Sequence, residues 1–133
     1  MEEVEEAVRD MPNGKVPGLD GFTIDFYKAC LEIIKTEVWE VVEDSRCSSS
    51  ILKSLNSTFI ILIPKEEEAN TLSKFRPIAL CNVLYKIISK VIANKLNPIL
   101  PGIISEEQSG YVEGRQIMDN IFLAQEMIHT LQT

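Results

Sequence analysis

The chain has 133 residues, 45% of them hydrophobic and 25% charged, which is typical of one soluble domain. The net charge of −7, taken over the whole chain, argues against a nucleic-acid-binding protein. The chain has three widely spaced cysteines and one histidine, which predict neither a disulfide framework nor a zinc site. The longest apolar run, Phe59 to Pro64, is too short to span a membrane. The first residues are acidic, so we expect no secretory signal or transit peptide and an intracellular protein, in the nucleus or cytoplasm.

Residues 1–57 predict an N-terminal helical part. Apolar spacing favours a short helix from Glu2 to Met11, followed by a turn-rich break from Pro12 to Gly21. Thr23 suits the cap of a second helix that runs to about Asp44. The residues expected inside are Val4, Ala7, Val8 and Met11 of the first helix, and Phe26, Cys30, Ile33, Ile34, Val38 and Val41 or Val42 of the second.

Residues 58–133 predict a hairpin and the helices that follow it. The run Thr58 to Pro64 is continuous and β-branched, typical of a strand buried on both faces. A charged loop, Lys65 to Lys74, leads to a second strand near Arg76 to Leu80. Asn82 is expected to cap the next helix, which ends at Pro98 and Pro101-Gly102, and a last helix begins near Ile117. Their inward residues are Leu84, Ile87, Ile88, Val91 and Ile92, then Ile121, Ala124, Ile128 and Leu131. The fold class is α+β, mostly helical.

Charge is distributed unevenly along the chain. Residues 1–44 hold four basic and twelve acidic side chains, a net of −8, whereas residues 69–105 hold five basic side chains and no acidic one. Lys86 and Lys90 lie four residues apart and therefore share one face of their helix. This middle zone is the candidate docking surface for a polyanion. A solvated lysine face is the alternative interpretation.

Four segments in this order resemble those of plant-type non-LTR (LINE-type) retrotransposon reverse transcriptases, which are RNA-directed DNA polymerases. The first runs from Gly14 to Phe22 and the second from Thr58 to Lys65. The third runs from Phe75 to Asn82 and on through Tyr85 to Leu96, and the fourth from Ser105 through Gly114-Arg115 to Ile121. Four segments in register, covering nearly the whole chain, make the resemblance far more specific than one motif would.

The resemblance implies the fingers and the start of the palm of a right-hand polymerase, with a two-stranded fingertip hairpin. Lys65 and Arg76 would then bind the incoming deoxynucleotide, since guanidinium and ammonium groups suit phosphate oxygens. Arg115 would contact the template, and Lys74, Lys86 and Lys90 are further candidates for nucleic-acid binding. The implied partners are an RNA template, a DNA primer and a deoxynucleoside triphosphate, with no membrane.

Each of these residues also has a plainer explanation. Arg76 can satisfy backbone carbonyls, and Lys65 can be half of a charge cluster with the glutamates that follow it. Arg115 can pair with Glu113 or Glu126. The side chains of Tyr85 and Phe75 suit a core as well as base stacking, and Gly18 and Gly21 suit turn geometry. Leu19 and Glu113 stand where relatives of this kind usually carry proline.

Nucleotide transfer in this family uses two Mg²⁺ ions held by aspartates on palm strands. This chain has five aspartates: Asp10, Asp20, Asp25, Asp44 and Asp119. No two of them are adjacent in the sequence, and none is expected in a strand. We therefore expect no catalytic or metal-binding residue, no bound cofactor, and a fragment that is inactive alone. The alternative is a non-catalytic interaction module derived from such an element, whose partner is the rest of the polymerase or another protein.

Overall fold

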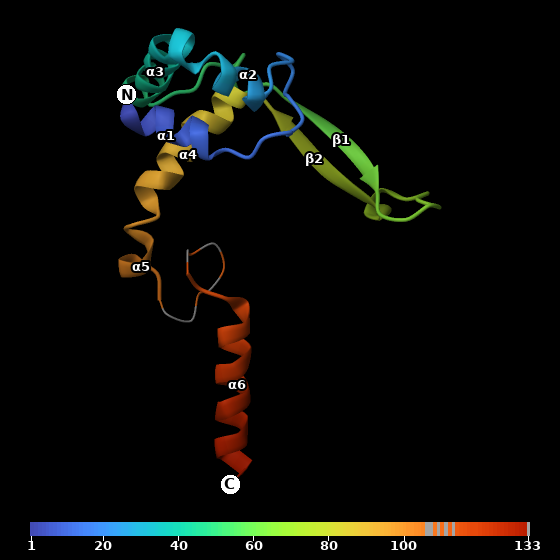
Figure 1. The fold of residues 1–133 in the computed structure, drawn as a ribbon. Helices are drawn as coiled ribbons and strands as arrows, with labels where there is room; N and C mark the ends of the chain where they lie inside the picture. Colours follow the sequence, from blue (N-terminus) through green and yellow to red (C-terminus); the bar gives the residue numbers. More distant parts are fainter. Residues whose placement is uncertain (106–107, 109, 111, 113, 133) are drawn as a thin grey trace. The chain divides into compact units, whose positions relative to one another are not determined.

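The computed structural model describes residues 1–105, 108, 110, 112 and 114–132, the last range without the side chains of residues 117, 119, 131 and 132. It forms two compact units, Met1–Val91 and Ile92–Thr133. The helices are α1 (Glu2–Asp10), α2 (Ile24–Ala29), α3 (Leu31–Ser48), α4 (Val83–Leu96), α5 (Leu100–Ile103) and α6 (Ile117–Gln132), and the strands are β1 (Thr58–Pro64) and β2 (Phe75–Cys81), with a short 3₁₀ turn, Leu72–Lys74, before β2 (Figure 1). The mixed, mostly helical fold class is confirmed.

The core of the first unit lies among α1, α2, α3 and α4. On α1 the predicted inward residues are correct, since Ala7 and Val8 have no exposed surface and Val4 is buried. Ile87 of α4 is also fully buried, and Ile24 of α2 is nearly so. Burial of this apolar surface is the main force that joins the four helices, because short helices are marginal when isolated.

The second predicted helix is two helices, and this changes which residues it buries. Cys30 has φ −97° and ψ 5°, so the backbone leaves the helical region there, and the N–H of Cys30 closes α2 on the carbonyl of Phe26. A single helical period therefore does not continue past residue 30. Tyr27 and Leu31 are buried, whereas Phe26 and Ile33 are 40% and 79% exposed, so their predicted burial is wrong. The Thr23 cap is confirmed, with its hydroxyl accepting from Phe26 N at 3.3 Å.

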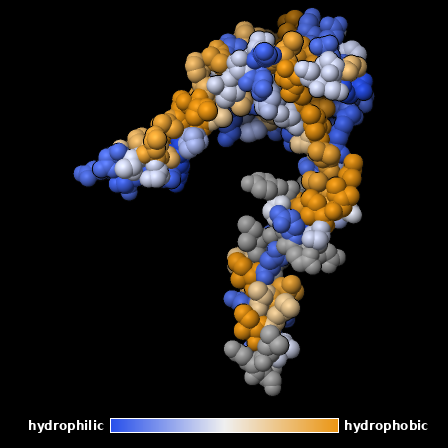
Figure 2. Space-filling view, turned by 180° about the vertical axis from the view of Figure 1, so that it is seen from behind, coloured by the Kyte–Doolittle hydropathy of each residue, from blue (hydrophilic) through white to orange (hydrophobic). Residues whose placement is uncertain are grey.

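The predicted hairpin is present, with β1 antiparallel to β2 and Ile61 opposite Ile78. The prediction that β1 is buried on both faces is wrong. Its five large apolar residues, Phe59 to Ile63, are between 40% and 69% exposed, because the described residues form a sheet of only these two strands and the hairpin extends away from the helices (Figures 1 and 2).

Asn82 connects the hairpin to the helical part of the first unit. It is 4% exposed, and its side-chain nitrogen donates to the carbonyls of Ser54 and Leu55 at 3.1 and 3.4 Å. Its side-chain oxygen accepts from Asp20 N at 3.4 Å, and its own carbonyl accepts from Lys86 N in the first turn of α4. One buried amide therefore holds the turn before α2 and the turn before β1 against the start of α4.

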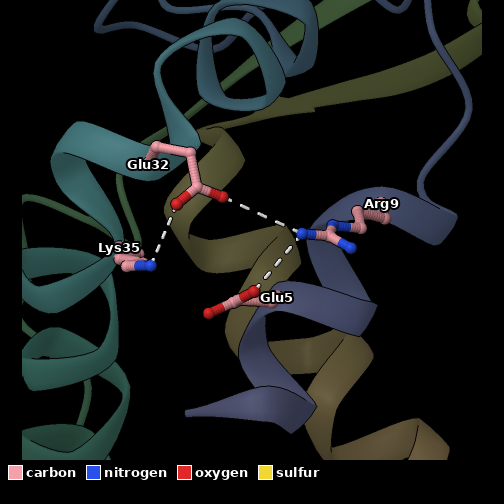
Figure 3. Close-up of polar contacts among 4 residues, drawn as sticks. All are labelled: Glu5, Arg9, Glu32 and Lys35. Carbon is pink, nitrogen blue, oxygen red and sulfur yellow. Dashed lines mark hydrogen bonds and ion pairs between the residues drawn. The ribbon is translucent and has the colours of Figure 1, made fainter.

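A small ion network joins the outer surfaces of α1 and α3 (Figure 3). Glu32 lies 3.0 Å from Lys35 Nζ and 4.0 Å from Arg9, and Arg9 also contacts Glu5 at 3.4 Å. The hydrogen bond and charge of Lys35 lower the pKa of Glu32, and Glu32 raises the pKa of Lys35. The groups are exposed, so the network adds little stability to the packing beneath it.

The second unit contains α5 and α6. The helix start predicted near Ile117 is confirmed, whereas α5 was not predicted, because Pro101 and Gly102 were interpreted as helix-ending residues. Pro101 lies in the first turn of α5, where its missing N–H has no intrahelical partner to lose. On α6, Ile121 and Ile128 are 43% and 57% exposed, so their predicted inward positions are wrong within this unit. The predicted position of the Leu131 side chain, and those of Glu113 and Asp119, lie outside what the structure describes.

Candidate nucleotide and nucleic-acid interface

The hairpin places three of the predicted cations on one of its faces. Residues directly opposite in an antiparallel pair point to the same side, and the register pairs Arg76 with Ile63. The bond from Lys65 N to the carbonyl of Lys74, at 2.8 Å, continues this register by one pair beyond the strands. Lys65, Lys74 and Arg76 therefore share a face at the tip of the hairpin, where Figure 2 shows hydrophilic colour beyond an apolar arm.

The two lysines of this tip are already engaged. Lys65 Nζ donates to the carbonyl of Ser73 at 2.7 Å, and Lys74 Nζ forms an ion pair with Glu66 at 2.6 Å. The sequence suggested Lys65 as the partner of the glutamates, but the ion pair is made by Lys74. Arg76 is exposed and makes no hydrogen bond or ion pair within the described part of the chain, so the alternative that it satisfies carbonyls gains no support there.

The same hairpin face continues toward its base as the wall of a pocket of about 380 Å³. Ile78 and Leu80 contribute from β2, and the other lining residues come from α4, α2 and the segment after α1: Met11, Pro12, Lys15, Val16, Ile24, Val83 and Lys86. The lining is apolar except for the two lysines, and Lys86 Nζ lies 3.5 Å from the carbonyl of Val16. A cavity of this kind suits a ligand that combines an apolar ring with a negative charge.

Lys15 was missed by the sequence reasoning, although the segment that holds it was noted. Its turn residues drew attention to backbone geometry, and that interpretation is confirmed for Gly21, which has φ +74° and whose N–H donates to the carbonyl of Gly18 at 3.2 Å. Gly18 is required for a different reason, because an added Cβ there would lie 2.6 Å from Asn82 Cα. The signal available was the lysine between Gly14 and Val16, in a segment that resembles the family. Lys90 follows Lys86 by one turn on α4, as predicted, and is half-buried.

Arg115 belongs to the second unit and has a structural role there. Its guanidinium donates to the carbonyls of Ser105, Gln108 and Ile104 at 2.5, 2.9 and 3.3 Å. These bonds hold the segment before α6, so a template contact by Arg115 stays a prediction. Of the predicted ion-pair partners, Glu113 lies outside the described residues. Tyr85 and Phe75 are both half-buried, which decides neither for a core role nor for base stacking.

The described residues offer no site that fits two Mg²⁺ ions. Among them, no group of three or more histidine, cysteine, aspartate or glutamate side chains could hold a metal ion. Asp10, Asp25 and Asp44 lie on three different helices, and Asp20 lies in the turn before α2. In the same part of the chain, no helix is both long and apolar enough to cross a membrane.

An α+β unit whose hairpin carries Lys65, Lys74 and Arg76 on one face, beside a lysine-flanked pocket, is suited to binding phosphorylated ligands. The comparisons with known proteins identify its family. Residues 63–133 match the profile described as reverse transcriptase (RNA-dependent DNA polymerase). The chain is also 32% identical, over 129 residues, to the Transposon TX1 uncharacterized 149 kDa protein of Xenopus laevis. The chain belongs to the reverse transcriptase family, and the resemblance to a retrotransposon enzyme is confirmed. The match covers 97% of this chain and 10% of that relative's length.

Proposed function

We propose that this chain forms the fingers and the start of the palm of a retrotransposon RNA-directed DNA polymerase, and that the hairpin tip binds the incoming deoxynucleoside triphosphate. The observation that carries the proposal is the shared face of Lys65, Lys74 and Arg76 at the end of an exposed hairpin. Arg76 is the principal ligand, because its fork can grip two phosphate oxygens and nothing in the described part of the chain competes for it.

The two tip lysines have a supporting role. Lys65 closes the loop by binding the carbonyl of Ser73, and Lys74 neutralises Glu66. Without the Lys74 pair, the glutamates of the tip would repel a triphosphate next to Arg76. Lys86 and Lys90 continue the positive charge along α4, where the RNA template and DNA primer are the partners that the family implies.

Binding of a deoxynucleoside triphosphate, measured by equilibrium dialysis, tests the proposal. A charge-assisted hydrogen bond contributes roughly 1.5–3 kcal/mol, so Arg76→Ala should weaken binding by about tenfold or more. Arg46→Ala is the matched control, since Arg46 is another exposed arginine and is paired with Glu43 on α3. No binding by the wild-type chain, or an equal loss in both variants, contradicts the proposal.

We also propose that these 133 residues do not catalyse nucleotide transfer alone. Among the described residues, no group of three or more histidine, cysteine, aspartate or glutamate side chains could hold a metal ion, and the mechanism needs two closely held metal ions. Primer extension on an RNA template, with Mg²⁺ and all four deoxynucleotides, should give no product above the protein-free control. Measurable extension would show that the chain supplies a metal site that its described residues do not reveal.

A non-catalytic interaction module is the second candidate, and the exposed apolar residues of β1 and α6 favour it. Phe122, Leu123 and Met127 are 59%, 55% and 62% exposed, and large exposed apolar surfaces are typical of interaction sites. This candidate predicts a chain that melts cooperatively and binds a protein partner while Arg76→Ala leaves that binding unchanged. If the wild-type chain binds no protein partner, this candidate is wrong.

A further inference from the structure

The two outer edges of the hairpin differ in the backbone donors that they present. Antiparallel pairs alternate between bonded and non-bonded positions, and the bond from Lys65 N to Lys74 O marks its pair as bonded. Following this alternation along the register, Ile63, Ile61 and Phe59 direct their backbone N–H and C=O groups toward their partners on β2, which are Arg76, Ile78 and Leu80. Thr58, Ile60 and Leu62 therefore direct their N–H groups outward, away from β2.

The outer edge of β2 is poorly suited to accept another strand. Its outward positions are Phe75, Pro77, Ala79 and Cys81, by the same alternation. Proline has no N–H, and the N–H of Phe75 is already bonded to the carbonyl of Leu72. Near its base, β2 also contributes Ile78 and Leu80 to the pocket against the helices. A proline and positive charge are the usual means by which proteins protect a sheet edge, and β2 carries both, since Arg76 lies beside Pro77.

The outer edge of β1 has none of this protection until Pro64. The strand is uncharged from Thr58 to Pro64, and Ile60 is 69% exposed. Thr58, Ile60 and Leu62 each retain an outward donor and an outward acceptor, and none of these three donors bonds to another backbone group in the described part of the chain. A two-stranded sheet is only marginally stable by itself, so an added strand on this edge would stabilise it.

We propose that the outer edge of β1 pairs with the same edge of a second copy of the chain. The two strands run antiparallel, and the two-fold symmetry axis of the dimer passes beside Ile60. In that register Ile60 lies opposite its own copy and Thr58 lies opposite Leu62, so all three outward donors meet an acceptor. Two bonds for each of three pairs give about six hydrogen bonds in a four-stranded sheet. Phe59 lies opposite Ile61 on one face, an aromatic pair with a β-branched residue.

A second copy fits this edge better than a charged peptide, because the paired segment carries no charge of its own. The net charge of −7 on each chain opposes association, yet no charged side chain lies between Thr58 and Pro64, so the contact itself brings no like charges together. Pro64 ends the pairing, since it has no N–H to offer. The interface is isologous, with each segment facing its own copy, and so closes as a dimer instead of growing into a fibre.

Sedimentation over a wide range of protein concentration tests the dimer. Ile60→Pro removes the outward donor at the two-fold axis and leaves the bonds to β2 intact, and it should weaken dimerisation by at least about tenfold. Ala79→Pro is the matched control, because Ala79 is the partner of Ile60 and also points outward, on the protected edge of β2. Circular dichroism confirms that both variants fold.

A crosslink gives a second measurement if Ile60→Pro does not fold. Residues in a bonded antiparallel pair have Cα atoms about 5.5 Å apart, within the range that a disulfide spans. Ile60→Cys should therefore form a covalent dimer on mild oxidation, well above the level seen in Ala79→Cys, which shares the three native cysteines. A wild-type chain that stays monomeric at every concentration overturns the proposal, as does equal crosslinking of the two variants.

Discussion

The helical part of the first unit and the hairpin that extends from it use similar apolar residues to opposite effect. Val8 and Ile87 have no exposed surface, whereas Ile60, an equally apolar residue, is 69% exposed. The helices have each other to pack against, since α1, α2, α3 and α4 place their apolar sides together. The hairpin has two edges and two faces, and in the described chain only the base of one face lies against the helices.

This difference separates two meanings of an apolar residue. In the helical part, an apolar residue packs against other residues of the same unit, and truncating its side chain lowers the free energy of unfolding. In the hairpin, an exposed apolar residue belongs to a surface that can bind another molecule. We propose that this molecule is a nucleotide near the tip and a second copy of the chain along β1. A large exposed apolar surface on a small unit is most simply explained by an interaction.

The largest effect expected is from truncation in the helical core. Ile87→Ala should lower the free energy of unfolding by about 2–5 kcal/mol, because a fully buried isoleucine leaves a cavity. Ile60→Ala, the same change on the hairpin, should alter it by less than ~0.5 kcal/mol in dilute protein. Urea denaturation of both variants measures the difference. Similar losses in the two variants would mean that Ile60 is packed in the hairpin as tightly as Ile87 is in the helical core.

The parts of the fold that the sequence predicted correctly are those set by local pattern. The face of α1, the Thr23 cap, the hairpin and the start of α6 each follow from spacing or from one residue type within a few positions. The errors came from features that local pattern does not encode. A continuous apolar run shows that a strand is apolar on both faces, but not whether this chain supplies the cover, and β1 was therefore assigned a burial that it does not have.

The candidate site was predictable in its residue types and less so in its bonding. The resemblance to the family identified Lys65, Lys74 and Arg76, and the register then placed them on one face. Which lysine pairs with Glu66 depends on how the loop returns. The bonds of Arg115 to three carbonyls depend on where the backbone brings Ile104, Ser105 and Gln108, which residue type alone does not encode. Lys15 was missed because its pocket is assembled from residues far apart in the sequence.

The junction at Asn82 gives the next largest effect. In Gly18→Ala the new methyl group would lie within 2.6 Å of the Asn82 backbone, so the turn or the start of α4 must move. Overpacking of this kind costs about 1–3 kcal/mol, measured as a lower melting temperature. Gly102→Ala is the control, because its added methyl meets nothing within 4 Å and an alanine suits a helix. A stable Gly18→Ala variant would show that Asn82 does not hold this turn tightly.

A smaller effect is expected from Tyr27 at alkaline pH. Burial, with a contribution from Asp20, raises the pKa of Tyr27 from 10.0 to about 12. The folded state thus holds this proton more tightly than the unfolded state, so the stability is complete below pH 10 and is lost as pH rises from 10 through 12. We expect a loss of about 1 kcal/mol, since one pKa unit corresponds to ~1.36 kcal/mol and the ring keeps some contact with water.

Tyr27→Phe isolates this contribution. Lysines titrate over the same pH range in both proteins, so the difference in unfolding free energy between wild type and Tyr27→Phe reports Tyr27 alone. That difference should change in favour of the variant above pH 10 and stay constant below it. A difference that does not vary with pH would mean that the hydroxyl of Tyr27 is as accessible to water in the folded chain as in the unfolded one.

The smallest effect is expected at the surface of the helical part, where Glu32 connects α1 and α3 (Figure 3). Lys35 and Arg9 lower the pKa of Glu32, so the contribution of this carboxylate is present above its ordinary pKa of 4.5 and is lost as pH falls through the lowered value. Glu32→Gln should lower the melting temperature slightly at neutral pH and low salt, and not at high salt, because exposed charges are screened. Glu37→Gln, an exposed glutamate on the same helix, controls for net charge. If Glu32→Gln destabilised the chain as much as Ile87→Ala, ionic contacts and not apolar packing would join these helices, and burial of apolar side chains would not be the main force between them.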